Sequence, residues 1–512
     1  MATADTRVPA PDASTPPSFG PSPQTPPSWL RANWGLLLGI AAMAAILWLP
    51  TPAGLPVAGH RMLALLAFAV IVWMTEAVDY AVSAVVIAGL MALLLGFAPN
   101  VANPNALYGT SAALTLAFSG FANTALALVA AALFLAAAMT ATGLDKRIAL
   151  TILSRVGTET RHVVMGIIVV GFVIAFLVPS TTARVACLVP ITLGIIAAFG
   201  VSKRSAFAGM LMITTVQTAS IWNVGIKTAA AQNMVAIGFV ERTLGATITW
   251  LEWFIAAAPF AVLMSAALYF VMTRMMPPEV THVPGGREAI RKALTDLGPM
   301  KPSEMKLLAL SLTLLGFWAT EGVLHRLDTS TTTVIAVALM FLPGFAIMTW
   351  KEAQPRIPWG TVVLFGIGIS LGTALLQTRG ATWLANIVST QLGLTDATAL
   401  VVLGAMSVFL VVIHLGFASA TALASAMIPI VIAVLQGVAT PGINVVGMTM
   451  LLQFVVSFGF ILVVNAPQNM VAYGTETFEA RDFVRTGLVL TAIALVLVMA
   501  LGATYWRWLG YV

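Results

Sequence analysis

The chain carries Ser180-Thr-Thr-Ala183 ahead of Pro190-Ile191 and repeats this pattern as Ser419-Ala-Thr-Ala422 ahead of Pro429-Ile430. Ten residues separate the serine from the proline in both copies. In each copy these small polar residues interrupt a long apolar stretch. The pattern indicates two similar, interrupted segments, one in each half of the chain.

A second motif is also repeated, with one copy further along each half of the chain. Gln232-Asn-Met-Val-Ala236 recurs letter for letter as Gln468-Asn-Met-Val-Ala472. The first pair of motifs is offset by 239 residues and the second by 236, in the same order. Two coincidences with nearly the same offset indicate that the halves arose by duplication.

The composition of the chain assigns it to the membrane. Of its 512 residues, 59% are hydrophobic and 9% are charged, whereas a soluble domain carries roughly 25% charged residues. Such a chain is a polytopic membrane protein, which excludes soluble enzymes and nucleic-acid-binding proteins. Its single cysteine, Cys187, permits no internal disulfide and excludes a secreted disulfide scaffold.

Apolar stretches long enough to span a bilayer predict an all-α fold with eleven membrane helices, two of them interrupted. They lie at about 34–50, 62–75, 82–97, 122–141, 205–240 (interrupted), 251–272, 304–322, 331–348, 359–377, 445–475 (interrupted) and 483–505. Two further stretches, 160–200 and 396–437, are each consistent with two full spans or with one re-entrant hairpin. We predict hairpins that enter from opposite sides, because each stretch has small polar residues at its midpoint.

The basic residues predict the orientation of the chain. With the N-terminus inside, cytoplasmic segments hold sixteen Lys and Arg and outer segments hold five, leaving two in the tail and two in the motif segments. This bias predicts a cytoplasmic N-terminus, and we expect a bacterial inner membrane. Residues 1–33, rich in proline, are expected to form a disordered cytoplasmic tail.

The two copies are predicted to face opposite ways, because an odd number of crossings separates them. Inverted repeats with paired broken helices are typical of secondary transporters, which bind their substrate near the midplane of the membrane. A repeated packing motif without transport is the alternative. The sequence therefore favours a carrier.

The charges around the motifs indicate an anionic ligand. No Asp or Glu lies between Glu159 and Glu241, or between Asp396 and Glu476. These two intervals nevertheless contain three basic side chains, which are Arg184, Lys227 and His414. A central Arg or Lys costs about 2.5–3.5 kcal/mol on insertion scales, so the missing partner is expected to be the ligand, an anion.

Two of these three basic residues also have a structural alternative. Arg184 is expected to bind or line the site, but snorkelling to an interface or capping of carbonyls would also explain it. Lys227 falls in the expected break of its helix. His414 is a possible accessory residue, and a hydrogen bond within its hairpin is its alternative role.

Uncharged groups at the interruptions also favour an anion. Ser and Thr hydroxyls, together with the free N–H groups of helix N-termini, favour negative charge. Asn233 and Asn469 are expected to line the site, a role compatible with capping the restarted helices. The missing carboxylates argue against a cation carrier that relays protons through intramembrane Asp or Glu.

On these residues the chain resembles the divalent anion/sodium symporter (DASS) family. The similarity runs from about 34 to 510 and includes Trp73-Met-Thr-Glu-Ala77, Gly143-Leu-Asp-Lys-Arg-Ile148, the two serine triplets and Asn465-Ala-Pro-Gln-Asn469. It implies a homodimer in the lipid bilayer that moves dicarboxylates, tricarboxylates or sulfate by an elevator-type mechanism. It implies sodium as a possible coupling ion, with no other cofactor and no nucleic acid partner.

The resemblance also implies a division of the chain into scaffold and transport parts. The scaffold parts would be 34–157 and 304–393, the transport parts 158–272 and 394–512, and a cytoplasmic linker 273–303 would join the halves. Residues expected to face the substrate or coupling ion are Ser180, Thr181, Thr182, Ser419, Ala420 and Thr421, with Asn465 and Asn469 in the matching late segment.

The chain departs from the family at the centre of both triplets. Thr181 and Ala420 stand where the family has asparagines that help to bind carboxylate and sodium. A fixed ammonium at Lys227 would neutralise the substrate in place of sodium. Such a carrier would return only with bound anion, so we slightly favour anion exchange over sodium-coupled symport of dicarboxylate or sulfate.

Two other classes of protein are alternatives to a carrier. A membrane-embedded enzyme is a distant alternative, since the sequence has no His-Glu-x-x-His metal pair and no nucleophile elbow. Five scattered histidines predict no metal site. An ion channel is the second alternative, and the paired broken helices favour a carrier over it.

Overall fold

The computed structural model describes residues 33–157, 159–279, 286–438 and 442–512, and these residues form helices and no strand. The prediction of an all-α fold is confirmed. The expected tail, apart from Asn33, and part of the expected linker lie outside the described residues. The helix α2 (Trp34–Trp48) precedes two halves that repeat the same order of elements.

The first half contains ten α-helices. They are α3 (Val57–Thr75), α4 (Tyr80–Gly96), α5 (Thr110–Phe118), α6 (Thr124–Thr142), α7 (Leu144–Leu153), α8 (Thr160–Leu177), α9 (Thr181–Ala198), α10 (Ala206–Gly225), α11 (Ala231–Phe239) and α12 (Trp250–Met275). A short helix, α13 (Gly286–Thr295), then lies in the segment that joins the halves and contacts α7 and α9.

The second half repeats this series. Its helices are α14 (Pro302–Thr320), α15 (Thr329–Phe341), α16 (Trp350–Ala353), α17 (Trp359–Gln377), α18 (Gly380–Gln391), α19 (Ala399–His414), α20 (Ala420–Gly437), α21 (Val445–Val456), α22 (Pro467–Tyr473) and α23 (Ala480–Ala503), followed by α24 (Tyr505–Trp508). Each element from α3 to α12 therefore has a counterpart between α14 and α23.

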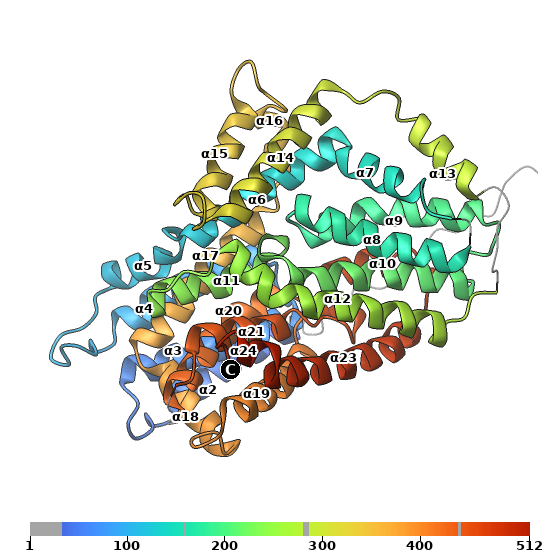
Figure 1. The fold of residues 1–512 in the computed structure, drawn as a ribbon. Coiled ribbons are helices and arrows are strands. Elements are labelled where there is room, and N and C mark those ends of the chain that lie inside the picture. Colours follow the sequence, from blue (N-terminus) through green and yellow to red (C-terminus); the bar gives the residue numbers. More distant parts are fainter. Residues whose placement is uncertain (1–32, 158, 280–285, 439–441) are drawn as a thin grey trace, which may run out of the picture.

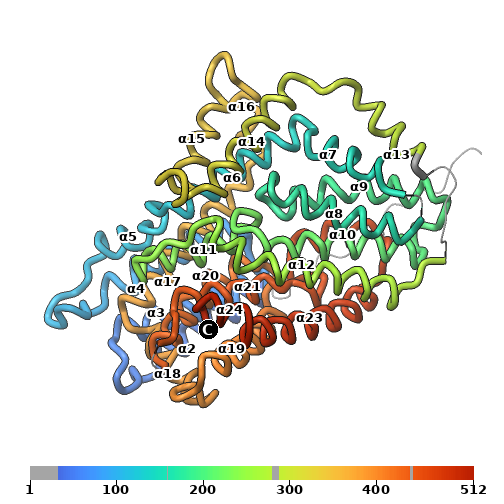
Figure 2. The backbone as a smooth tube through the Cα atoms, viewed as in Figure 1, coloured from blue at the N-terminus to red at the C-terminus, as the bar shows by residue number. Residues whose placement is uncertain are grey.

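The helices of the two halves pack as exchanged pairs. Helix α4 contacts α17, and their counterparts α15 and α6 also contact each other (Figure 1). In the same way α9 contacts α22 while α20 contacts α11. The last long helices of the halves, α12 and α23, run side by side (Figure 2). This exchange is the packing expected of an inverted repeat.

The stretches 160–200 and 396–437 form helical hairpins, as predicted. In hairpin 1 (α8 and α9) the chain turns back at Val178-Pro-Ser180, and in hairpin 2 (α19 and α20) it turns at 415–419. Both serines act as N-caps, since Ser180 Oγ accepts from Ala183 N and Ser419 Oγ accepts from Ala422 N. The two tips meet at one cavity, described below.

The two interrupted helices are also observed. Broken helix 1 is α10 and α11 with the 3-10 turn Lys227–Ala229 between them, and broken helix 2 is α21 and α22 with the turn Val463–Asn465. A break frees backbone carbonyls that no water can satisfy in a bilayer. A duplicated asparagine supplies the donors at each break.

These two asparagines make matching hydrogen bonds. Asn233 Nδ2 donates to the carbonyl oxygens of Asn223 (2.7 Å) and Ile226 (3.3 Å). Asn469 Nδ2 donates to those of Gly459 (3.0 Å) and Leu462 (3.3 Å). The donor follows its acceptors by ten and seven residues in both halves, so the repeated sequence produces a repeated local structure.

Length and composition qualify many of these helices as membrane spans. Among the described residues, eight segments are long and apolar enough to cross a membrane: α3, α6, α8, α9, α12, α17, α20 and Ala480–Trp508. Shorter apolar helices include α2, α4 and α15. The eleven crossings predicted from the sequence correspond to α2, α3, α4, α6, broken helix 1, α12, α14, α15, α17, broken helix 2 and α23.

Some helices differ from the sequence prediction. Helix α15 ends at Phe341 rather than near 348, because Pro343 and Gly344 follow and Gly344 adopts a positive φ of 87°. Helices α5 and α18 were not expected, because each has too few residues to span a bilayer. Helix α18 is the counterpart of α7 and contacts hairpin 2, as α7 contacts hairpin 1.

The meeting of the hairpin tips can be tested by cross-linking. In a Cys187→Ser background, cysteines at positions 181 and 420 should be joined by a short bis-maleimide, since both positions line the same cavity. The matched control pairs position 181 with 434, which is buried inside α20. Efficient labelling of 181 and 420 from opposite bulk phases, without a cross-link, would contradict this architecture.

Candidate functional site

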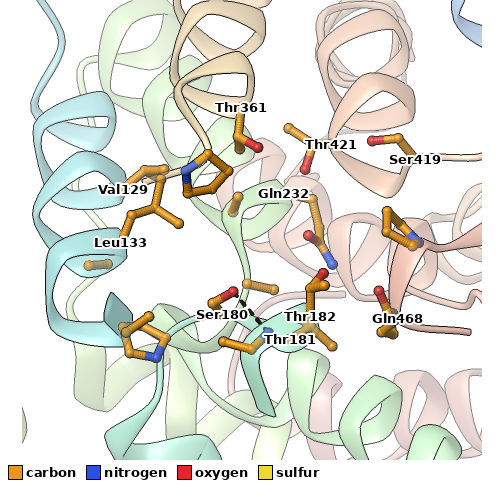
Figure 3. Close-up of a pocket in the computed structure, with 18 of the residues that line it drawn as sticks. Val129, Leu133, Ser180, Thr181, Thr182, Gln232, Thr361, Ser419, Thr421 and Gln468 are labelled. Atoms are coloured by element: carbon orange, nitrogen blue, oxygen red, sulfur yellow. Dashed lines mark hydrogen bonds between the residues drawn. The ribbon is translucent and has the colours of Figure 1, made fainter. Parts of the chain in front are cut away.

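A cavity of about 800 Å³ lies between the tips of the two hairpins (Figure 3). Six helix starts and one helix face line it. The starts are those of α4, α9, α11, α17, α20 and α22. The face belongs to α6, which contributes Leu128, Val129, Ala132, Leu133, Ala136, Ala137 and Thr140. The cavity therefore has a polar side, built from the two repeats, and an apolar wall.

The polar side is electropositive because helices begin there. Helices α9, α11 and α20 direct their N-termini at the cavity, and the first N–H groups of a helix have no partner within it. The helix dipole adds partial positive charge at the same end. The starts of α9, α11, α20 and α22 contribute no Asp or Glu to the lining, and the one carboxylate there, Asp79, comes from the start of α4. The arrangement suits an anion.

The structure brings together the six residues predicted at the hairpin tips. Ser180, Thr181 and Thr182 line one side of the cavity, and Ser419, Ala420 and Thr421 line the other. Their hydroxyls lie across the cavity from each other, with Gln232 and Gln468 nearby (Figure 3). Two sets of donors on opposite sides match a ligand that has two acceptor ends.

Sequence reasoning missed the two glutamines. Gln232 and Gln468 belong to the duplicated motifs, but the neighbouring asparagines were chosen instead. The available signal was position, because each glutamine lies in the first turn of a restarted helix, next to the break. Asn223, Thr228 and Thr361 also line the cavity and carried no sequence signal.

The three predicted asparagines lie behind the cavity rather than in its lining. Asn233 and Asn469 are fully buried and cap the breaks as described above. Asn465 Nδ2 donates to the carbonyl oxygens of His414 (2.8 Å) and Phe417 (3.0 Å), which ties the tip of hairpin 2 to broken helix 2. Their role in this structure is to satisfy backbone groups.

Arg184 makes the corresponding connection in the first half. Its guanidinium donates to the carbonyl oxygens of Val178 (3.1 Å) and Ala229 (3.1 Å) and to Oδ1 of Asn223. The side chain is 1% exposed and is not part of the cavity lining. Arg184 therefore joins the tip of hairpin 1 to broken helix 1 and caps carbonyls, which was its predicted alternative role.

The structure does not bring Lys227 to the cavity. Its side chain is buried, and Nζ donates to the carbonyl oxygen of Ile248 at 2.6 Å. Lys227 is absent from the cavity lining, although its neighbours Thr228 and Ala230 belong to it. The short 3-10 turn directs the lysine away from the cavity, so direct neutralisation of a bound anion by Lys227 does not follow from this geometry.

His414 also lies outside the lining, at the end of α19. Its ring is buried, and neither ring nitrogen has a hydrogen-bond partner in the described part of the chain. The backbone carbonyl of His414 accepts from Phe417 N within hairpin 2 (3.0 Å) and from Asn465 of broken helix 2 (2.8 Å). The imidazole packs beside Gly459, close to the break of broken helix 2.

The remaining charged residues of the cavity come from outside the repeated motifs. Asp79 and Arg356 contribute one charge of each sign, and Tyr80 lies beside Asp79. Asp79 also caps α4, accepting from Ala81 N at 2.8 Å. Both charges lie on segments that the sequence predicts to be cytoplasmic.

No group of three or more His, Cys, Asp or Glu side chains that could hold a metal ion occurs in the residues that the structure describes. Oxygen atoms of the hairpin loops are the other available ligands. In hairpin 1 the Val178 carbonyl is occupied by Arg184, and in hairpin 2 those of His414 and Phe417 are occupied by Asn465. Each of these three carbonyl oxygens therefore already accepts one hydrogen bond from a side chain.

The chain is similar to several bacterial membrane proteins. It is 56% identical over 484 residues to a "membrane protein" of Cupriavidus necator, with 94% of each chain covered. It is 25% identical to the citrate/succinate antiporter and 27% identical to the L-tartrate/succinate antiporter of Escherichia coli, each covering 92% of this chain and 97% of the relative.

A solved structure shares the fold. The YdaH transporter of Alcanivorax borkumensis superposes with a TM-score of 0.55 at 15% identity, covering 83% of this chain and 97% of that one. The family model of the sodium:sulfate symporter transmembrane region matches residues 30–512. The resemblance seen in the sequence is confirmed, and the chain belongs to the family of sodium:sulfate symporters, the DASS transporters.

Proposed function

We propose that the protein is a secondary active transporter that exchanges small organic polyanions, dicarboxylates or tricarboxylates, by an elevator mechanism. The convergence of three helix N-termini on one cavity carries this proposal. The family is one of transporters rather than enzymes, and two of the relatives are named as antiporters of citrate or L-tartrate with succinate. Their names support the same substrate class here.

The cavity has the size and the donors that such anions need. A volume of about 800 Å³ accommodates a four- to six-carbon polyacid together with water. Hydroxyls from both hairpin tips and the amides of Gln232 and Gln468 are donors to carboxylate oxygens. Donors from the two repeats face each other, so one carboxylate can bind at each hairpin tip.

Exchange is supported by the side chains that occupy the loop carbonyls. Arg184, rather than Lys227, is the fixed cation nearest to the hairpin 1 tip, and it reaches the cavity through Thr181 and Asn223. A guanidinium within the protein supplies positive charge without a coupling ion. The carrier would then cross the membrane more readily with a bound anion to balance that charge, which is the requirement for exchange.

An elevator mechanism is supported by the contrast between the two sides of the cavity. The hairpins and broken helices contact each other through exchanged pairs, which suits a unit that moves as one body. The opposite wall is the apolar face of α6, which offers few directional contacts to break during sliding. In this proposal the scaffold and transport parts expected from the sequence would slide against each other at this boundary.

The family and its bacterial relatives support a proposal for the cellular setting. We propose a homodimer in a bacterial inner membrane with a cytoplasmic N-terminus, with lipid and a small anion as partners. A cavity lined by Asp79 and Arg356 would then be open to the cytoplasm. Sodium-coupled symport of dicarboxylate or sulfate remains the second candidate, favoured by the description of the family itself.

Exchange and symport differ in counterflow. Purified protein in liposomes loaded with succinate should take up labelled succinate, whereas empty liposomes should take up almost none. Replacing sodium with choline should leave the rate unchanged, because the fixed cation is part of the protein. Uptake into empty liposomes that depends steeply on sodium would establish symport instead.

The site can be tested with three substitutions to methionine. Gln232→Met and Gln468→Met remove an amide donor from the cavity, and a hydrogen bond to a charged group is worth about 1.5–3 kcal/mol, or roughly 10- to 150-fold in affinity. Lys227→Met is the matched control and should leave succinate affinity nearly unchanged. Titration of succinate by intrinsic fluorescence measures all three. A large loss of succinate affinity in the Lys227→Met variant alone would show that Lys227 belongs to the binding site.

A further inference from the structure

Asn223 occupies a distinctive position in the last turn of α10. It is 2% exposed, yet it belongs to the lining of the cavity. Its backbone carbonyl accepts from Asn233, so the residue is fixed at the point where broken helix 1 is interrupted. A buried amide at the wall of an anion cavity is a potential ligand, provided that its NH₂ group faces the cavity.

Two donors determine how this amide is oriented. Thr181 Oγ1 donates to Asn223 Oδ1 at 2.7 Å, and Arg184 Nη2 donates to the same oxygen. Both contacts require oxygen at this position, so Nδ2 lies on the other side of the amide. In the described part of the chain no acceptor bonds to Nδ2.

The charge of Arg184 strengthens this donor. A guanidinium that binds the amide oxygen withdraws electron density from the amide, and hydrogen bonds in such a chain reinforce each other. The N–H groups of Asn223 thereby become better donors to a carboxylate. Arg184 acts as a positioning residue: it does not line the cavity, but it orients and polarises the side chain that does.

The second half of the protein lacks this arrangement. The counterpart of Asn223 is Gly459, since Asn233 and Asn469 donate to these two carbonyls in the same way. At the offset of the hairpin motifs, Thr181 corresponds to Ala420 and Arg184 to Leu423. Hairpin 2 therefore offers hydroxyls and a helix N-terminus, but no oriented amide backed by a cation.

We propose that Asn223 is a substrate-binding residue that makes the cavity asymmetric, with a tight carboxylate subsite at hairpin 1 and a weaker subsite at hairpin 2. This inference rests on the proposed function and deepens it. Every transported anion places one carboxylate against Asn223 and Thr182, while the other end lies near Ser419 and Thr421. The protein thus requires one carboxylate strictly and tolerates variation at the distal end.

A purely structural role for Asn223 makes a different prediction. If the amide oxygen only held Arg184 and Thr181 in place, a substitution that keeps this oxygen would leave the affinity for every ligand unchanged. An anchoring role instead requires the N–H donor, so the same substitution lowers the affinity for every ligand that places a carboxylate at hairpin 1. The comparison of a diacid with its half-ester then separates the two subsites, because the half-ester keeps one carboxylate and replaces the other with an uncharged group.

The experiment compares Asn223→Asp with Thr421→Val, using succinate and monomethyl succinate as probes for the full-length protein. Asn223→Asp keeps the oxygen that Thr181 and Arg184 require and replaces the donor with a second acceptor. It should lower the affinity for both probes by roughly 10- to 150-fold. Thr421→Val removes a hydroxyl at hairpin 2. It should lower the affinity for succinate by several-fold and leave the affinity for the half-ester nearly unchanged.

The outcomes are distinguishable. Normal binding of both probes by Asn223→Asp, or a loss in Thr421→Val that is equal for the two probes, would overturn the proposal. Asn223→Ser, which retains a small donor, provides a second variant if the aspartate variant fails to fold, and it should lose less affinity. If the wild type binds neither probe, the proposed function itself fails, whatever the variants do.

Discussion

The structure depends on satisfying backbone carbonyls where helices are interrupted inside an apolar environment. Each unsatisfied group in a bilayer costs several kcal/mol. Asn233 and Asn469 satisfy the breaks of the two broken helices, while Arg184 and Asn465 connect each hairpin tip to the break beside it. These four side chains therefore stabilise both the breaks and the hairpin tips.

The same interruptions produce the chemistry of the site. At a helix break, the preceding helix ends in unpaired carbonyl groups and the following helix begins with unpaired N–H groups. The protein satisfies these two kinds of group differently. Side-chain donors occupy the carbonyl ends, whereas the amide ends of α9, α11 and α20 are left facing the cavity. The positive ends of the helices are therefore available to a ligand, and an anion can bind without a full positive charge in the lining of the repeats.

Much of this architecture could be predicted from the sequence because the duplication is visible as motifs that occur in both halves. The matched serines located both hairpin tips, and the matched Gln-Asn motifs located both restarted helices. A repeated motif does not show in which direction each of its side chains points. Lys227 lies in the predicted break, but its turn points it to Ile248, and Gln232 rather than Asn233 faces the cavity. Asn223 was missed because its counterpart is a glycine, so no repeat marked it.

The two halves share a backbone but differ in the side chains that stabilise it. Arg184 in the first half has no basic counterpart in the second, where an uncharged amide, Asn465, binds the carbonyls of the hairpin loop. Placing a permanent charge in only one half concentrates the positive potential at hairpin 1. A symmetric fold can in this way hold a ligand in one preferred orientation.

Arg184 holds the tip of hairpin 1 against broken helix 1. Hydrogen exchange of an Arg184→Met variant, followed by mass spectrometry in detergent, tests it most directly. Peptides covering 176–186 and 222–232 should lose protection, while 412–424 in hairpin 2, held by Asn465, should exchange as in the wild type. Unchanged protection at both hairpin 1 and its broken helix, or an equal loss at both hairpins, would contradict the account.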